Sequence, residues 1–189
     1  MMDFTQYQEL FLDILANPDP AAPYNDPHYV EYVKLNWSRQ QRWLKTGMLN
    51  SELVTAIEGI NQEQFWTIIT EPWCGDAAHT VPFMHMLSAL NPLISVDYQM
   101  RDSPPFLIEH YLTNGVSKSI PKLIIADKDH HDLAVWGPRP ADCQRLFTQL
   151  QEQHLDYLET KIILQKWYND DRGVSFQEEL LAITEKILA

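Results

Sequence analysis

The turn that decides this fold reads Thr70-Glu71-Pro72-Trp73-Cys74-Gly75-Asp76-Ala77. It follows residues 65–69, a short run of aromatic and β-branched residues that predicts a buried strand. It precedes residues 77–90, where apolar residues recur at helical spacing. Cys74 is therefore expected at a strand-to-helix turn. Unpaired backbone N–H groups and the helix dipole stabilise an anion there, which favours the nucleophilic thiolate form of a cysteine.

The segments beyond this turn alternate between strands and helices. We expect a strand over 93–100, a helix near 104–113, an antiparallel hairpin of strands over 123–126 and 133–136, and three helices from residue 142 with a break at Gly173. The order strand, helix, strand, helix, strand, strand, helix predicts an α/β fold with a mixed central sheet and flanking helices.

Helices are also expected before the turn. Apolar spacing predicts them over residues 4–16 and 27–45, the second with Gly47 as a C-cap, and a short one beginning near Ser51. We expect the Trp and Tyr side chains of these helices in the core rather than around a ligand. The sequence shows no repeat or obvious second domain, so 1–189 is expected to form one domain with a core over about 62–150 and helical extensions over 1–60 and 151–189.

The turn resembles the active site of the thioredoxin superfamily, whose motif is Trp-Cys-Gly-Pro-Cys. Here it reads Trp73-Cys74-Gly75-Asp76-Ala77, and Pro82 stands where the family has a proline that kinks the helix. The family also has a cis-proline after an apolar residue, beside the catalytic cysteine, and Ile120-Pro121 fits that pattern. The resemblance covers about residues 62–150. It implies a thioredoxin-like fold in which Ile120 and Pro121 lie next to Cys74.

A wider set of segments is similar to a bacterial branch of thioredoxin-like proteins with extra N-terminal helices and a single motif cysteine. These segments are Asn36-Trp37-Ser38-Arg39, Thr70-Glu71-Pro72-Trp73-Cys74-Gly75-Asp76, Arg101-Asp102, Ser119-Ile120-Pro121-Lys122, Trp136-Gly137-Pro138-Arg139-Pro140 and Lys166-Trp167-Tyr168. The resemblance implies the fold and the extra helices, and it implies no particular substrate.

Two departures from the thioredoxin pattern affect the resolving half of disulfide exchange. Ala77 replaces the second motif cysteine, so no disulfide can close within the motif. Ile68 stands where many thioredoxins carry a buried acid on the preceding strand, the proton acceptor for that second cysteine. A protein with this pattern is not expected to complete dithiol exchange alone.

Charged residues near Cys74 have opposing effects on its thiol. Asp76 should raise the thiol pKa because two like charges repel. Arg101 and Arg139 each follow a strand expected to end near the cysteine turn, so either could offset Asp76. We therefore take Cys74, Trp73 and Pro121 as candidate catalytic residues, and Ile120, Gly75, Asp76, Arg139 and Arg101 as candidate substrate-binding residues.

The second cysteine and the histidines give weaker signals. Cys143 begins a predicted helix and is expected to be a small core residue, with a resolving thiol as the alternative. The set Cys74, Asp76 and His79 offers only three ligands at an unfamiliar spacing, and His130 and His131 are expected to be solvated in a hairpin turn. We predict no metal and no cofactor.

The bulk composition limits the partners. The net charge is -12, which repels phosphate backbones and anionic lipid heads, so neither nucleic acid nor membrane is an expected partner. No apolar run reaches the roughly 20 residues of a membrane helix, and residues 1–20 do not have the pattern of a secretory signal. We expect a cytoplasmic protein with reduced thiols. The oligomeric state is left open.

Two functions remain open at this point. The first is a monothiol disulfide exchange protein or thiol redox sensor, in which Cys74 forms a mixed disulfide with a protein disulfide or a low-molecular-weight thiol. The second is a redox-inactive thioredoxin-fold scaffold that binds a peptide or protein in the same groove. The missing thiol at Ala77 and the presence of Asp76 favour the second, whereas Trp73, Cys74 and Pro121 favour the first.

Overall fold

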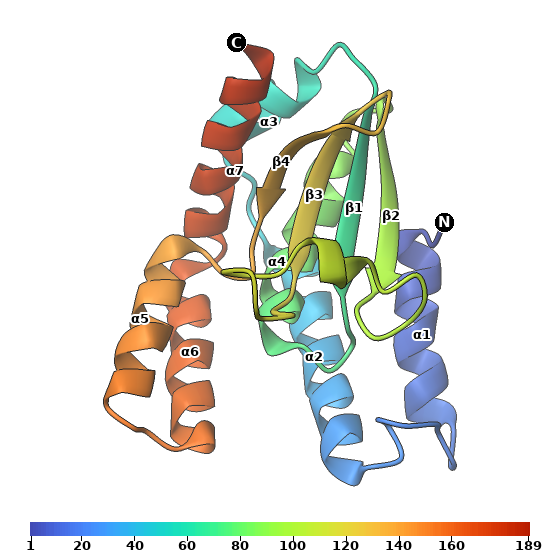
Figure 1. Ribbon diagram of the computed structural model, residues 1–189, viewed down its shortest axis with the longest axis vertical. Helices are drawn as coiled ribbons and strands as arrows, with labels where there is room; N and C mark the ends of the chain where they lie inside the picture. The colour runs from blue at the N-terminus through green and yellow to red at the C-terminus, as the bar shows by residue number, and fades with distance from the viewer.

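The computed structural model describes all residues, 1–189. Seven α-helices, one 3-10 helix and four strands follow one another along the chain (Figure 1). They are α1 (Phe4–Ala16), α2 (Pro27–Thr46), α3 (Ser51–Glu58), β1 (Gln64–Thr70), α4 (Gly75–Ser88), β2 (Ile94–Met100), η1 (Leu107–His110), β3 (Lys122–Asp127), β4 (Asp132–Trp136), α5 (Ala141–Glu152), α6 (Tyr157–Asp171) and α7 (Val174–Leu188). The expected mixed α/β fold with additional helices at both ends is confirmed.

The four strands form one mixed sheet in the order β2-β1-β3-β4. β1 and β2 are parallel, because α4 connects them as a crossover, and β1 and β3 are antiparallel. β3 and β4 form the expected antiparallel hairpin. Residues that end β1 and β2 and residues that begin β3 therefore meet at one edge of the sheet, where the cysteine turn also lies.

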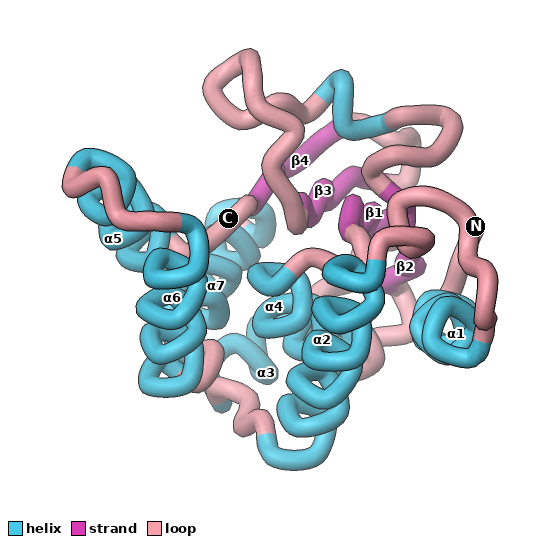
Figure 2. The backbone as a smooth tube through the Cα atoms, turned by 90° about the horizontal axis from the view of Figure 1, so that it is seen from below, coloured by secondary structure: helices cyan, strands magenta, loops and turns pink.

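Helices cover one face of the sheet, and a long connection crosses the other. Figure 2 shows α2 and α4 below the strands, and the connection from β2 to β3, with η1, above them. α5 and α6 form a separate antiparallel pair to one side of the sheet (Figure 1). A main core of 27 buried residues includes Tyr7 and Phe11 from α1 and Trp66 from β1. A second small core lies between α5 and α6.

The helix expected near 104–113 is wrong. Only η1, a four-residue 3-10 helix, forms there. Pro105 keeps the backbone of Pro104 out of the helical region. Neither proline has an N–H to donate to a helix. Phe106 then takes a left-handed conformation at φ 57°, which prevents a regular helix from starting earlier. The start of α3 also differs in detail, because Asn50 rather than Ser51 caps it.

Candidate functional site

Cys74 lies where the turn after β1 becomes α4. It is the N-cap residue of that helix, and its Sγ accepts a hydrogen bond from the Ala77 N–H at 3.5 Å. Its thiol donates to the carbonyl oxygen of Ile120 at 3.4 Å. The Ile120–Pro121 peptide bond is cis. The fold thus brings together Cys74 and the Ile120-Pro121 loop, which are separated by 46 residues in the sequence.

The environment of Cys74 favours the protonated thiol. The residue is 6% exposed. Burial, and after it the negative charge of Asp76, raise the pKa of Cys74 to about 12. The Ala77 N–H and Arg139 lower this pKa, but by smaller amounts. The expectation of a thiolate stabilised by the helix N-terminus is therefore wrong. Desolvation opposes the charged form more strongly than one helix end supports it.

Asp76 and Arg139 meet close to the thiol. Arg139 Nη2 lies 2.7 Å from an Asp76 carboxylate oxygen, and both side chains are largely buried. Tyr168 donates its hydroxyl proton to the other Asp76 oxygen at 2.8 Å. Gln144 accepts a hydrogen bond from Arg139, whose guanidinium also packs on the Phe147 ring. Elements from both halves of the chain therefore hold this ion pair in place.

Arg101 lies on the same side of the sheet but has a different role from Arg139. Its guanidinium stacks 4.6 Å from the ring centroid of Trp73 and makes two hydrogen bonds to the Asp102 carboxylate. Burial lowers the pKa of Arg101, but the hydrogen bond and charge of Asp102 outweigh it, with smaller contributions from Glu71 and Cys74, so the pKa is raised. Both candidate arginines thus lie near the cysteine, and each already has a carboxylate partner.

The N-terminal extension supports the cysteine turn. Asn36 of α2 is buried and donates its side-chain N–H to the carbonyl oxygen of Pro72 at 3.0 Å. Arg39 donates to the Asn36 side chain at 2.8 Å and lies beside Gly75. The segment containing Asn36 and Arg39 was predicted only as part of a family resemblance. Its hydrogen bonds show that α2 positions the turn.

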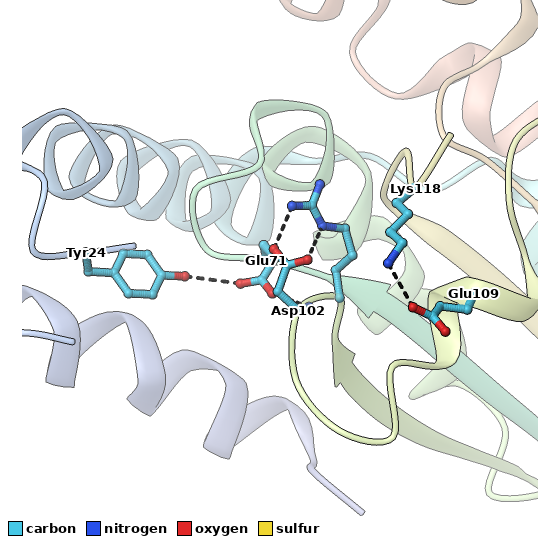
Figure 3. Close-up of polar contacts among 6 residues, drawn as sticks. Tyr24, Glu71, Asp102, Glu109 and Lys118 are labelled. Atoms are coloured by element: carbon cyan, nitrogen blue, oxygen red, sulfur yellow. Dashed lines mark hydrogen bonds and ion pairs between the residues drawn. The ribbon is translucent and has the colours of Figure 1, made fainter. Parts of the chain in front are cut away.

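A buried acid that sequence reasoning missed is Glu71, at the end of β1. Its carboxylate accepts a hydrogen bond from the Tyr24 hydroxyl at 3.2 Å (Figure 3). It accepts a second from the Asp102 N–H at 3.1 Å. Burial raises the pKa of Glu71. The signal in the sequence was a lone acid between an apolar strand and a proline. In the thioredoxin pattern the buried acid belongs within the strand, at the position of Ile68.

Gly137 fixes the position of the loop that faces Cys74. Its φ is 117°, and a Cβ on it would lie 2.2 Å from the carbonyl oxygen of Pro121. Lys122, which is also buried, donates to the Gly137 carbonyl at 3.2 Å. Only glycine allows this close approach with this backbone conformation.

Cys143 and His79 are both buried away from solvent. Cys143 is fully buried in the small core with Leu150, Leu164 and Tyr168, and both cysteines are free. Burial raises its pKa to about 12. His79 accepts a hydrogen bond from Trp43 at one ring nitrogen, and its other ring nitrogen lies 3.1 Å from Gln165. Since both nitrogens are engaged, His79 is not available to join Cys74 and Asp76 as a metal ligand.

One group of potential metal ligands lies elsewhere, in the β3–β4 turn. Asp127, Asp129 and His131 offer ligand atoms within 4.8 Å of one another. The Asp127 carboxylate already accepts backbone hydrogen bonds from the other two, and the His131 ring is solvated as expected. These contacts explain the cluster as the structure of a tight turn.

Comparison with known proteins agrees with this architecture. The family model described as Thioredoxin matches residues 24–152, which is more than half of the chain. The chain therefore belongs to the thioredoxin family. Two solved structures share its fold, each with 16% sequence identity and a TM-score of 0.58. One is a protein of unknown function from Pseudomonas aeruginosa, covering 98% of this chain and 99% of that one.

The other solved structure is an HIV epitope-scaffold, covering 98% of this chain and 93% of that one. At this identity both likenesses show the fold alone. A search of curated proteins gives no match. No helix in the structure is long and apolar enough to cross a membrane.

Proposed function

We propose that this chain is a thioredoxin-fold protein that binds an extended peptide beside Ile120 and does not complete disulfide exchange. The observation that carries this proposal is the burial of the Cys74 thiol, which is 6% exposed and donates a hydrogen bond to the Ile120 carbonyl. Burial raises the pKa of this thiol, so at neutral pH it is far less ionised than an ordinary cysteine, which is a few per cent thiolate. Reaction with a disulfide would be correspondingly slow.

The backbone of Ile120 supports peptide binding. Its carbonyl accepts the Cys74 thiol, and its N–H donates no hydrogen bond within the chain. An unpaired N–H in a loop is a site where the backbone of an extended segment can add by a strand-like hydrogen bond. Trp73 and Arg101 stack beside the turn and offer an apolar and a cationic surface to such a segment. The expected partner is therefore a protein segment rather than nucleic acid or membrane.

A second candidate is the monothiol exchange protein or redox sensor. It is favoured by the position of Cys74 Sγ at the start of α4, beside the Ile120-Pro121 loop. The thiolate would attack one sulfur of a disulfide, the S–S bond would break, and one thiolate would leave while a mixed disulfide forms. Ala77 offers no second sulfur, so an external thiol would have to resolve that mixed disulfide. Membership of the single-cysteine bacterial branch and a cytoplasmic location are parts of this same proposal.

Treatment with oxidised glutathione distinguishes the two candidates. The reduced protein and a free cysteine peptide are incubated together at neutral pH, and intact masses are followed. The first candidate predicts a fully modified peptide and an unmodified protein. An adduct of about 305 Da that is absent from Cys74→Ser and present in Cys143→Ser would favour the second.

Peptide binding is tested without any thiol chemistry. The probe is reduced and alkylated insulin B chain, titrated into ¹⁵N-labelled protein while amide and indole resonances are recorded. We expect shifts centred on the Ile120 amide and the Trp73 indole, with the same affinity in Cys74→Ser. Saturable binding that leaves both resonances unchanged would contradict a site at this loop, and an absence of binding would count against peptide recognition.

A further inference from the structure

A hollow of about 400 Å³ lies on the side of Trp73 formed by the helical extensions. It is lined by His28, Tyr29, Tyr32, Trp73, Tyr157 and Lys161. The first two turns of α2 and of α6 supply five of these residues, and the cysteine turn supplies the sixth. The expectation that tyrosines of the N-terminal helices belong to the core is wrong for Tyr29 and Tyr32. They form the wall of an open hollow instead.

The walls are aromatic on three elements. Tyr29 meets Trp73 edge-to-face, with ring centroids 5.9 Å apart and planes at 86°. Tyr32 and Tyr157 approach from α2 and α6, and Tyr157 is 69% exposed. An exposed tyrosine facing a second helix's tyrosine across a hollow provides a surface on which a planar ring can pack. The volume is in the range that holds a small ligand.

Lys161 places a positive charge within these walls. Its ammonium lies 3.4 Å from the ring centroid of Tyr32 and 4.0 Å from that of Tyr157. It belongs to none of the chain's ion pairs, and no acidic residue lines the hollow. Asp26 and Asp156 cap α2 and α6 through backbone N–H groups and lie outside the lining. In a chain of net charge -12, this is an unpaired cation in an aromatic setting.

We propose that the hollow binds a carboxylate carried by an aromatic ring. The ring packs among Tyr29, Tyr32 and Trp73, and the carboxylate pairs with the Lys161 ammonium. A cationic ligand is disfavoured because Lys161 already occupies the tyrosine faces and repels a like charge. A neutral aromatic ligand would cover the ammonium without giving it a partner, which is costly. The combination of aromatic walls and one unpaired cation therefore selects an aromatic acid.

Two sources can supply this chemistry. One is a free aromatic acid, and the other is a peptide that ends in an aromatic residue with a free C-terminal carboxylate. Both present a ring and a carboxylate separated by a short linker. Nothing in this proposal depends on the thiol of Cys74, so its failure and the failure of the proposed peptide-binding function are distinguishable.

The experiment compares matched ligands that differ only in charge. Phenylacetate and phenylacetamide are titrated into the full chain, and so are the peptide Gly-Gly-Phe and its C-terminal amide, with binding followed by NMR at the Trp73 indole and by calorimetry. We expect each acid to bind saturably with one site and at least tenfold more tightly than its amide. If Gly-Gly-Phe binds more tightly than phenylacetate, the site reads a peptide end. If phenylacetate binds as tightly as Gly-Gly-Phe, the site recognises only the ring and the carboxylate, as expected for a free aromatic acid.

Variants separate the charge from the walls. Lys161→Gln should remove the difference between acid and amide, and Lys161→Arg should retain most of it. Lys166→Gln is the matched control, because Lys166 is an exposed lysine of the same helix that pairs with Asp170. Tyr32→Leu should weaken acid and amide together. Equal binding of acid and amide, no saturable binding of either acid, or an unchanged difference in Lys161→Gln would overturn the proposal.

Discussion

Asp76 and Arg139 form an ion pair that joins the first turn of α4 to the segment after β4, with 2.7 Å between Nη2 and the carboxylate. The two charges have opposite effects on Cys74. Asp76 raises the pKa of the thiol, and Arg139 lowers it by a smaller amount. The ion pair has no net charge, but its two charges do not cancel at the Cys74 sulfur, because Asp76 is only two residues away from it. Burial is the main reason that Cys74 stays protonated, and the ion pair adds to this effect while it holds the turn in place.

Replacing Asp76 with Asn should uncouple these two effects. We expect the pKa of Cys74 to fall, since a charge that raises it is removed while Arg139 remains. Alkylation at mildly alkaline pH should become several-fold faster. Stability should fall by about 3 kcal/mol because Arg139 loses its partner in a largely buried site.

Thiolate absorbance across pH and urea unfolding, both in a Cys143→Ser background, measure these changes. Asp102→Asn is the control, since Asp102 is an exposed acid that pairs with Arg101. An unchanged thiol pKa in Asp76→Asn would show that burial alone sets it.

Gly137→Ala should displace the loop that faces Cys74. A Cβ at this position would lie 2.2 Å from the Pro121 carbonyl, at a φ of 117°. We expect a loss of about 3 kcal/mol or more, from backbone strain together with the clash. Gly115→Ala is a matched control, because Gly115 also has a positive φ but an open surrounding, so strain alone of about 1 kcal/mol is expected there. Urea unfolding measures both, and equal losses would contradict a specific contact between Gly137 and Pro121.

The sequence predicted the helices and strands well where local pattern determines them. The run of aromatic and β-branched residues in β1, the alternation in β2 and the break at Gly173 each rest on neighbouring residues alone, and the structure has them. Near 104–113 the apolar spacing was misleading, because the prolines and the left-handed Phe106 override it. Local periodicity does not report such backbone constraints.

The chemistry of the site could be predicted only in part. The family resemblance implied that Ile120 lies beside Cys74, and the expected strand ends indicated Arg139, and the structure places both near it. The protonation of the thiol was not predictable from the motif, because it depends on burial by distant segments. Glu71 and the hollow at Lys161 were not predicted, for the same reason. Their partners, Tyr24 and Tyr32, come from an extension whose packing on the core no local pattern reveals.

His79 should make the protein less stable in acid. Burial lowers the pKa of His79 from 6.5 to about 3. Below pH 6.5 the unfolded chain therefore binds a proton at this residue that the folded chain does not, and stability falls as the pH drops from 6.5 to 3. The slope from one such group is at most about 1.4 kcal/mol per pH unit.

Urea unfolding at a series of pH values measures that slope. In His79→Phe the slope through this range should be reduced, although the variant is less stable at neutral pH because Trp43 and Gln165 lose a partner. A slope that is the same in His79→Phe as in the unaltered chain would contradict a neutral buried His79.

Ala77→Cys should restore a disulfide within the motif. The Ala77 N–H points at Cys74 Sγ from 3.5 Å, and one turn of α4 separates the two residues, so a second sulfur at this position lies on the same side of the helix. Ala77 is fully buried, and the added sulfur should cost about 1 kcal/mol of stability before oxidation. On treatment with diamide, the mass should fall by ~2 Da as the two thiols join. Val81→Cys is the control, because Val81 is equally buried but lies two helical turns from Cys74, beyond the reach of a disulfide. Even with its disulfide, Ala77→Cys should reduce a test disulfide slowly, since burial and Asp76 still hold Cys74 protonated and Ile68 offers no acid for the second thiol. Adding Asp76→Asn should accelerate it. Rapid turnover by Ala77→Cys alone would show that the missing second thiol, and not the protonation of Cys74, is what limits this chain.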